Sequence, residues 1–483
     1  MKIEKFLEFE EKYDLFNREV IGEYYWEYCR IFMFFFIQSF YDNTSNIINL
    51  KPPKPCRKLS LSMLSKYFLR GRKCDILFVS DPRRYMVGDT YINTFCDPVS
   101  STISDEYKTL TLEEPAWVAK YDTFPPHFTP TNDNDLIYVD IYEHEFVIKK
   151  WLYHRLHKRK INKIEEELKY IFSIIHDEFG VDISFSISEF TDIILYNVLM
   201  RKIYIKLISK ISPKVIIINY RPTYFKTLII GVCKDMGIPV VELQHGSINK
   251  DEPMNRKLHP RSYERYFADY IFCFGKKLVV SDYIIPRSLK YVGYPFLEYV
   301  QSLCLEKPKI IEDGKKYILV ISQSTIGDQL SEFTSALSVY LSDRPEYIII
   351  FKYHPNETGR NYPCLDKKNI IQIKELDNYV TQYHKYAYCQ IGVYSTAIYE
   401  GLRYLLPTII VDNLYNAQML IGVVSHITKG IYYVKDAATT YSIIDSLRAP
   451  SPEDIKTLWE DNAILNTQEE IRAIIENNGN ESV

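Results

Sequence analysis

Three residues that could do chemistry, Gln244, His245 and Gly246, follow directly on the apolar run 238–243. This run is too short for a helix, and its two valines favour a buried strand that ends at the turn. A glycine after the histidine lets the backbone turn sharply and approach a ligand closely. Since the ordinary pKa of histidine is near ~6.5, His245 is a natural general base for a hydroxyl group at neutral pH.

A second set of polar residues predicts a phosphate site in the C-terminal half. His354 and Pro355 end an apolar strand, and the fixed φ of the proline directs the histidine into the following loop. Ser395 or Thr396 is a good N-cap, and the N–H groups and dipole of the helix behind it attract anions. Glu400 lies one turn further on the same face, where it could accept from ribose hydroxyls. A surface turn and a capped helix with a solvated glutamate are the plainer alternatives.

Two more turns carry polar residues behind predicted strands. Ser322 and Ser324 follow an apolar strand, and their hydroxyls could complete a nest of phosphate donors. In the N-terminal half, Asp81 ends a strand and begins a loop that carries Arg83 and Asp89. This loop is either a solvated turn or part of a site at the sheet's carboxyl edge, where ligands of open α/β sheets bind.

Several common cofactor motifs are absent from the sequence. It contains neither G-x-x-x-x-G-K-[ST] nor G-x-G-x-x-G, so neither a P-loop ATPase nor an ordinary dinucleotide enzyme is indicated. No Asp-x-Asp directly follows a predicted strand, and no histidines and cysteines have zinc spacing. We therefore expect no bound cofactor and no metal site.

The composition is that of a soluble globular protein. The 483 residues are 46% hydrophobic and 25% charged, with a net charge of −3, so no basic field argues for nucleic acid. Nine cysteines without a C-x-x-C pair are expected to be reduced thiols in the cytoplasm. The acidic N-terminus does not have the pattern of a secretory signal.

The elements that must position these residues alternate between strand and helix in both halves of the chain. This order predicts an α/β fold with two Rossmann-like domains, 1–300 and 301–483, that face each other across a cleft. The first 50 residues are expected to be helical, and the last helices could pack back on the N-terminal domain. We also expect a surface excursion over 97–135 and one long helix over 143–179.

A dense basic run from Lys149 to Lys163 falls within that long helix. A charge run of this kind is usually a solvated helix face. Its density also suits contact with an anionic glycan, a phosphorylated lipid carrier or the inner face of the cytoplasmic membrane. The sequence leaves these alternatives open.

The combination ELQHG, then YHP, then STxxxEG before a Pro-led apolar strand resembles GT-B glycosyltransferases of bacterial surface polysaccharide synthesis. Similar combinations occur in capsule transferases for Kdo or sialic acid and in the teichoic-acid glycerophosphotransferases. The resemblance covers roughly residues 210–415. It implies two GT-B domains and a CMP-, CDP- or UDP-linked donor. The acidic motif of bacterial sialyltransferases is missing, which leaves the catalytic base open between His245, Asp81 and Asp89.

The resemblance also implies a division of roles. His354 and the Ser395 and Thr396 hydroxyls would hold the nucleotide phosphates, and Glu400 would contact ribose. Gln244, His245 and Gly246 would face the acceptor or the transferred group. Beside the resemblance, we also expect Pro355 in the nucleotide site, Arg83 on the acceptor side, and a growing glycan or lipid-linked glycan as the acceptor. The alternatives are a CDP-polyol phosphotransferase, a nucleotide-sugar epimerase and a non-catalytic nucleotide-sugar-binding subunit.

Overall fold

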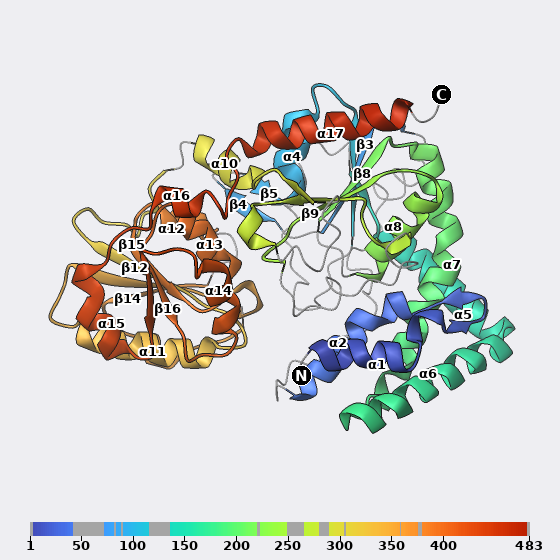
Figure 1. The fold of residues 1–483 in the computed structure, drawn as a ribbon, viewed down its shortest axis with the longest axis horizontal. Coiled ribbons are helices and arrows are strands. Elements are labelled where there is room, and N and C mark those ends of the chain that lie inside the picture. The colour runs from blue at the N-terminus through green and yellow to red at the C-terminus, as the bar shows by residue number, and fades with distance from the viewer. Residues whose placement is uncertain are drawn as a thin grey trace.

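The structure is a computed structural model. It describes residues 3–41, 72–81, 84–87, 90–114, 136–219, 223–248, 265–279, 289–303, 306–357, 359–374 and 379–480. Two parallel α/β domains account for most of these residues (Figure 1). The chain passes from one sheet to the other through α10 (Pro295–Ser302) and the segment behind it.

The N-terminal domain is built on a seven-stranded parallel sheet in the order β11-β10-β9-β8-β3-β6-β7. The strands are β3 (Ile76–Ser80), β6 (Thr109–Glu113), β7 (Leu136–Tyr138), β8 (Val215–Asn219), β9 (Val240–Leu243), β10 (Tyr270–Cys273) and β11 (Leu289–Tyr291). Every residue of β3 and β8 is buried, as expected for central strands covered by helices on both faces. The strand order reverses between β3 and β8, so a ligand crevice is expected there.

The C-terminal domain repeats this plan in a six-stranded parallel sheet, β14-β13-β12-β15-β16-β17. The strands are β12 (Lys316–Ile321), β13 (Tyr347–Lys352), β14 (Ile370–Ile373), β15 (Ala387–Gly392), β16 (Thr408–Val411) and β17 (Ile431–Val434). Its reversal point lies between β12 and β15. The helices of this domain are α11 (Gly327–Tyr340), α12 (Thr381–His384), α13 (Thr396–Arg403), α14 (Ala417–Val424), α15 (Ala437–Ile443) and α16 (Pro452–Ile455).

One helix, α8 (Tyr224–Asp235), connects β8 to β9 and packs on the N-terminal sheet. Further helices extend this domain: α1 (Ile3–Lys12), α2 (Trp26–Tyr41), α5 (Asp140–Leu156), α6 (Lys158–Phe179) and α7 (Ile187–Ile211). The first two share one apolar core with α6 and α7. The apolar helix α2 is buried in that core, as the sequence favoured, with Met33 and Ile37 fully inaccessible.

Two sequence-based expectations are wrong. The single helix predicted over 143–179 is two helices, because His157 leaves the helical region (φ −127°, ψ 39°) and α6 restarts behind it. The excursion predicted over 97–135 begins with α4 (Cys96–Ile103) and with β6, which is an interior strand of the sheet. Residues 115–135 lie outside the described residues.

The C-terminal helix α17 (Ala463–Asn480) crosses to the N-terminal domain and lies over α4 (Figure 1). Ile471 and Ile474 belong to an apolar cluster that α17 shares with α4 and with strands of the N-terminal sheet. Gln468 Nε2 donates to the Thr102 carbonyl at 2.6 Å. The chain's end therefore ties the two domains together.

Candidate active site between the two domains

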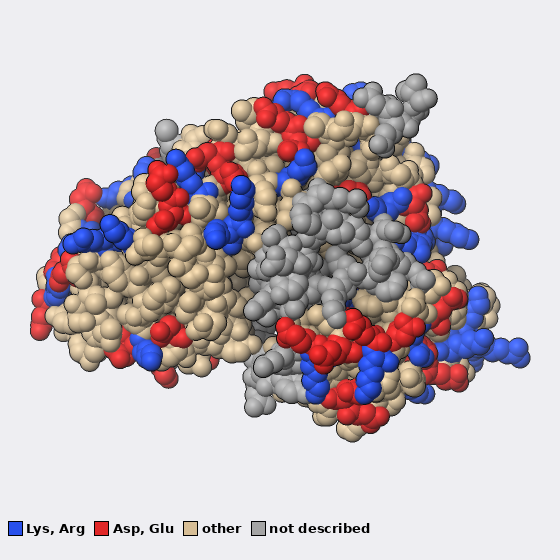
Figure 2. All heavy atoms as spheres, viewed as in Figure 1, with Lys and Arg blue, Asp and Glu red and all other residues tan. Residues whose placement is uncertain are grey.

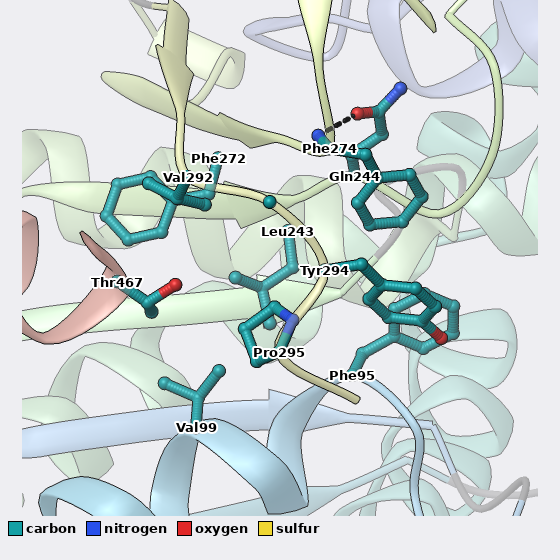
Figure 3. Close-up of a pocket in the computed structure, with 11 residues that line it drawn as sticks. Phe95, Val99, Leu243, Gln244, Phe272, Phe274, Val292, Tyr294, Pro295 and Thr467 are labelled. Atoms are coloured by element: carbon teal, nitrogen blue, oxygen red, sulfur yellow. Dashed lines mark hydrogen bonds between the residues drawn. The ribbon is translucent and has the colours of Figure 1, made fainter. Parts of the chain in front are cut away.

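Gln244 holds the turn behind β9 in place. Its side chain is 2% exposed, and its Nε2 donates to the carbonyls of Gly246 at 2.7 Å and Leu278 at 3.0 Å. Its Oε1 accepts from the Phe274 N–H at 2.6 Å (Figure 3). Because both ends of the amide bond the backbone, the structure gives Gln244 a positioning role for the residue that follows it.

That next residue, His245, is half-buried and stacks on Phe95, with ring centroids 5.1 Å apart and planes 24° apart. Phe95 in turn stacks on Tyr294 at 5.8 Å (Figure 3). The two aromatic rings therefore fix the plane of the imidazole. They also line a small, mostly apolar pocket, together with Val99, Leu243, Gln244, Phe272, Phe274, Val292, Gly293, Pro295 and Thr467.

A buried polar network occupies the reversal point of the N-terminal sheet. Asp81, 6% exposed, accepts from Asn219 Nδ2 at 2.7 Å. Lys226 Nζ bonds Asn219 Oδ1 and Glu114 Oε1, both at 3.0 Å. Burial raises the pKa of Glu114, and the charge of Lys226 opposes that rise. The network thus carries two carboxylates, Asp81 and Glu114, at the carboxyl ends of neighbouring strands.

Asn93 links this network to the histidine turn. Its Nδ2 donates to the Asp81 carbonyl at 3.0 Å, and its Oδ1 accepts from the Phe95 and Cys96 N–H groups at 3.1 and 3.0 Å. Since Phe95 packs on His245, one asparagine sets the relative positions of Asp81 and His245. The two candidate bases are therefore linked through Asn93 and Phe95.

A buried arginine lies beside the network. Arg84 pairs with the buried carboxylate of Glu113 and lies 3.9 Å from Asp97 Oδ2. Its Nε and Nη1 have no hydrogen-bond partner among the described residues. Of the other residues that the sequence singled out in this loop, Arg83 and Asp89 lie outside the described residues.

In the C-terminal domain, the helix start for which the sequence predicts an anion site is the N-terminus of α13. Ser395 is the N-cap, and its Oγ accepts from the Ala397 N–H at 3.3 Å. Gln390 anchors the helix on β15, because its Nε2 donates to the Ile398 carbonyl at 2.8 Å. A Cβ at Gly401 would lie 2.1 Å from Gln390 Oε1, so a larger residue there would displace the buried Gln390 amide. Thr396 is left half-buried at the first turn.

Glu357, which the sequence did not single out, organises the loops that carry Ser322 and His354. Its side chain is 1% exposed. It accepts from Ser322 Oγ at 3.1 Å, from the His354 N–H at 2.7 Å and from Tyr362 OH at 2.6 Å. Pro355 opens the short helical turn that brings Glu357 back to the strand end. The Ser322 hydroxyl is therefore used within the fold, and His354 is held at a fixed place.

The loop behind β12, the remaining loop with a predicted phosphate role, contacts the loop behind β15, where the strand order of the C-terminal sheet reverses. Ser324 is half-buried in the turn behind β12. The next residue, Thr325, shares a hydroxyl–hydroxyl hydrogen bond with Tyr394, which directly precedes the Ser395 cap. The two loops that would surround a nucleotide phosphate are thus in contact.

Glu400 is turned inward. Its carboxylate is 4% exposed and accepts from Tyr379 OH at 2.7 Å and from Thr381 Oγ1 at 2.9 Å. Burial raises the pKa of Glu400 to about 7, and the two hydroxyls oppose the shift. Its expected contact with ribose remains a prediction, since both carboxylate oxygens already have partners within the domain.

The raised pKa of Glu400 predicts how stability depends on pH. The folded protein keeps this proton up to about pH 7, whereas the unfolded chain loses it near the ordinary value of ~4.5. Glu400 therefore makes the free energy of unfolding fall as the pH rises from about 4.5 to 7. Glu400→Gln should flatten that fall. Urea midpoints measured at intervals across this range check it, and an unchanged slope would contradict it.

The two domains meet at the histidine turn. A Cβ at Gly246 would lie 3.1 Å from Thr396 Oγ1, so the backbone of the N-terminal domain passes close to the first turn of α13. Ser247 hydrogen-bonds the side chain of Tyr399 from the same helix. Tyr85, in the hairpin of β4 (Tyr85–Val87) and β5 (Thr90–Ile92), packs edge-on against Tyr379 at 4.9 Å. The histidine turn and the first turns of α13 therefore lie next to each other at the domain boundary.

Known protein families and curated proteins give no match to this sequence. Solved structures do. A putative UDP-N-acetylglucosamine 2-epimerase from Listeria monocytogenes matches at 11% identity with a TM-score of 0.50, over 84% of this chain and 97% of that one. The calicheamicin glycosyltransferase CalG4 matches at 12% and 0.46, over 84% and 99%. The UDP-GlcNAc 2-epimerase from Neisseria meningitidis bound to UDP-GlcNAc matches at 12% and 0.48, over 83% and 99%.

These similarities extend to the fold alone. The chain has the GT-B fold: two parallel, doubly wound α/β domains that meet near the carboxyl ends of β9 and β15. The fold class predicted from the sequence is confirmed.

Proposed function

We propose that this protein is a glycosyltransferase that moves a sugar from a nucleotide-sugar donor to a growing bacterial surface polysaccharide. One observation supports the proposal most: the backbone of Gly246 passes close to Thr396, so a candidate base and a candidate phosphate site would face each other across the domain boundary. The polysaccharide acceptor rests on the motif resemblance of the sequence.

The donor's phosphates would bind at the start of α13. Backbone N–H groups there and the Thr396 hydroxyl would stabilise the negative charge that grows as the sugar leaves. His354, fixed through Glu357, would add a donor from the loop behind β13, which is separated from β15 by β12. The helix dipole and these donors would neutralise the leaving nucleotide without a metal ion.

The acceptor would be activated from the N-terminal domain. His245, held flat against Phe95, would take the proton of the attacking hydroxyl. Contact between the domains would exclude water from the donor and limit its hydrolysis.

A nucleotide-sugar epimerase is the second candidate. The observation that favours it is the pair of buried carboxylates, Asp81 and Glu114, which share a network at the same sheet edge as His245. Proton removal from a sugar carbon and its return need two such groups in one site. This reaction requires no acceptor.

Product analysis separates these functions. A thermal-shift screen with CMP, CDP, UDP, GDP and ADP first identifies the nucleotide, since binding to the folded state alone stabilises it. The matching nucleotide sugar is then incubated with and without a glycan acceptor, and the products are analysed by mass spectrometry. A sugar added to the acceptor supports the proposal. A chemically altered free donor in the absence of acceptor supports the epimerase. Transfer of a polyol phosphate supports the phosphotransferase. Nucleotide binding without any product supports a non-catalytic subunit.

A further inference from the structure

The second half of α5 shows an apolar face to solvent. Successive residues of an α-helix are about 100° apart, so the residues that line one side can be read from their spacing. The side that packs on the protein carries Tyr142, Glu143 and Phe146, each at most 2% exposed. The opposite side carries large apolar side chains that are 43–73% exposed: Val147, Ile148, Trp151, Leu152 and Leu156.

This pattern is the reverse of an ordinary surface helix, which is polar on its outer side. Single exposed apolar residues are common, but five on one helix face mark an interaction surface. Trp151 is the most informative of them. Its ring is 56% exposed and carries the Arg155 guanidinium over its face at 5.0 Å. A tryptophan beside a long basic side chain suits a boundary between water and an apolar phase.

Basic side chains surround this face. The run from Lys149 to Lys163 holds seven Lys or Arg and no Asp or Glu. Figure 2 shows blue side chains gathered where α5 and α6 meet. Lys150 is paired with Asp192 at 2.7 Å, and Lys149 lies 3.7 Å from Glu145. The others lie around the end of α5 and the start of α6: Arg155, Lys158, Arg159, Lys160 and Lys163.

We propose that α5 and the start of α6 dock this protein on an anionic lipid bilayer, with Trp151 and its apolar neighbours inserted at the interface. The apolar face would enter the boundary between head groups and acyl chains, while the basic residues bind the anionic head groups. Among the described residues, no helix is long and apolar enough to cross a membrane. Docking goes beyond the proposed reaction and needs neither nucleotide nor acceptor. The docking proposal and the proposed function can therefore fail independently.

Vesicle flotation tests the docking surface. The full chain is mixed with phosphatidylcholine vesicles that contain or lack phosphatidylglycerol, and the bound fraction is measured. Binding to the anionic vesicles alone is expected. Trp151→Glu with Leu156→Glu should weaken it by roughly tenfold or more, because both apolar anchors are lost. Lys158→Gln should weaken it by roughly fivefold.

The matched control replaces two other exposed apolar residues far from this face in the sequence, Val339→Glu with Leu465→Glu, and should bind like the wild type. Since all four residues are exposed, both double variants should keep the wild-type melting temperature. No binding by the wild type, or equal binding by the Trp151 and Leu156 variant, would overturn the proposal. So would a change from oligomer to monomer in that variant without vesicles, which would identify the face as a contact between copies.

Discussion

Replacing His245 by alanine should lower turnover by about 10²- to 10⁴-fold, the usual contribution of a positioned general base. The affinity for the nucleotide should stay unchanged, because His245 belongs to the N-terminal domain and the phosphate site to α13. In the transferase account, the imidazole takes a proton only as the acceptor attacks. Steady-state rates with saturating donor and acceptor, and a nucleotide titration of the same variant, check both parts.

His176→Ala is the matched control, since His176 is an exposed histidine on α6. It should turn over like the wild type. Near-normal turnover of His245→Ala would remove its role as base and turn attention to Asp81.

Phe95→Leu tests whether the Phe95 ring positions the imidazole of His245. It should lower turnover without changing nucleotide affinity, because the imidazole loses the surface that fixes its plane.

Glu357→Ala should lower the free energy of unfolding by roughly 3 kcal/mol or more. Its carboxylate accepts from Ser322, Tyr362 and the His354 N–H, and each buried donor without an acceptor costs about 1–3 kcal/mol. Nucleotide affinity should fall as well, because the loop that carries His354 loses its anchor. Urea denaturation and nucleotide titration measure the two effects.

Two variants sharpen that result. Glu357→Gln keeps one acceptor oxygen and should lose less stability than Glu357→Ala. Glu332→Ala removes an exposed carboxylate from α11 in the same domain and should change stability by about 0.5 kcal/mol at most. If Glu357→Ala were as stable as Glu332→Ala, Glu357 would not organise these loops.

The fold was predictable because most of its strands are recognisable in the sequence. Apolar runs such as 215–219 and 316–321 are bounded by turn residues and alternate with helices. Strand β6 was not predicted from the sequence, because its Ser- and Thr-rich surroundings suggested a loop. Its TLTLE pattern does alternate as a half-buried strand should. Glu113 and Glu114, at the end of this strand, were missed for the same reason. The break at His157 has no local signal, since a histidine is compatible with a continuous helix.

Half of the site followed from residue types at strand ends. Helix capping by Ser395 and the placement of His245 behind β9 are local properties that the sequence carries. Hydrogen-bond partners that come from distant segments of the chain are not local properties of this kind. Glu357 with Ser322, Asn93 with Asp81, and Glu400 with Tyr379 depend on how the loops fold over each other.

The central claim is that a nucleotide phosphate binds at Thr396, where the two domains meet. Calorimetric titration of the five nucleotides into wild type and Thr396→Val tests it most directly, because valine keeps the shape of threonine and removes the hydroxyl. A hydrogen bond to a charged group is worth about 1.5–3 kcal/mol. We expect one nucleotide to bind the wild type and to bind Thr396→Val at least roughly tenfold more weakly, while the exposed control Thr428→Val is unaffected. Equal affinity of Thr396→Val and wild type, or no binding of any nucleotide, would contradict it.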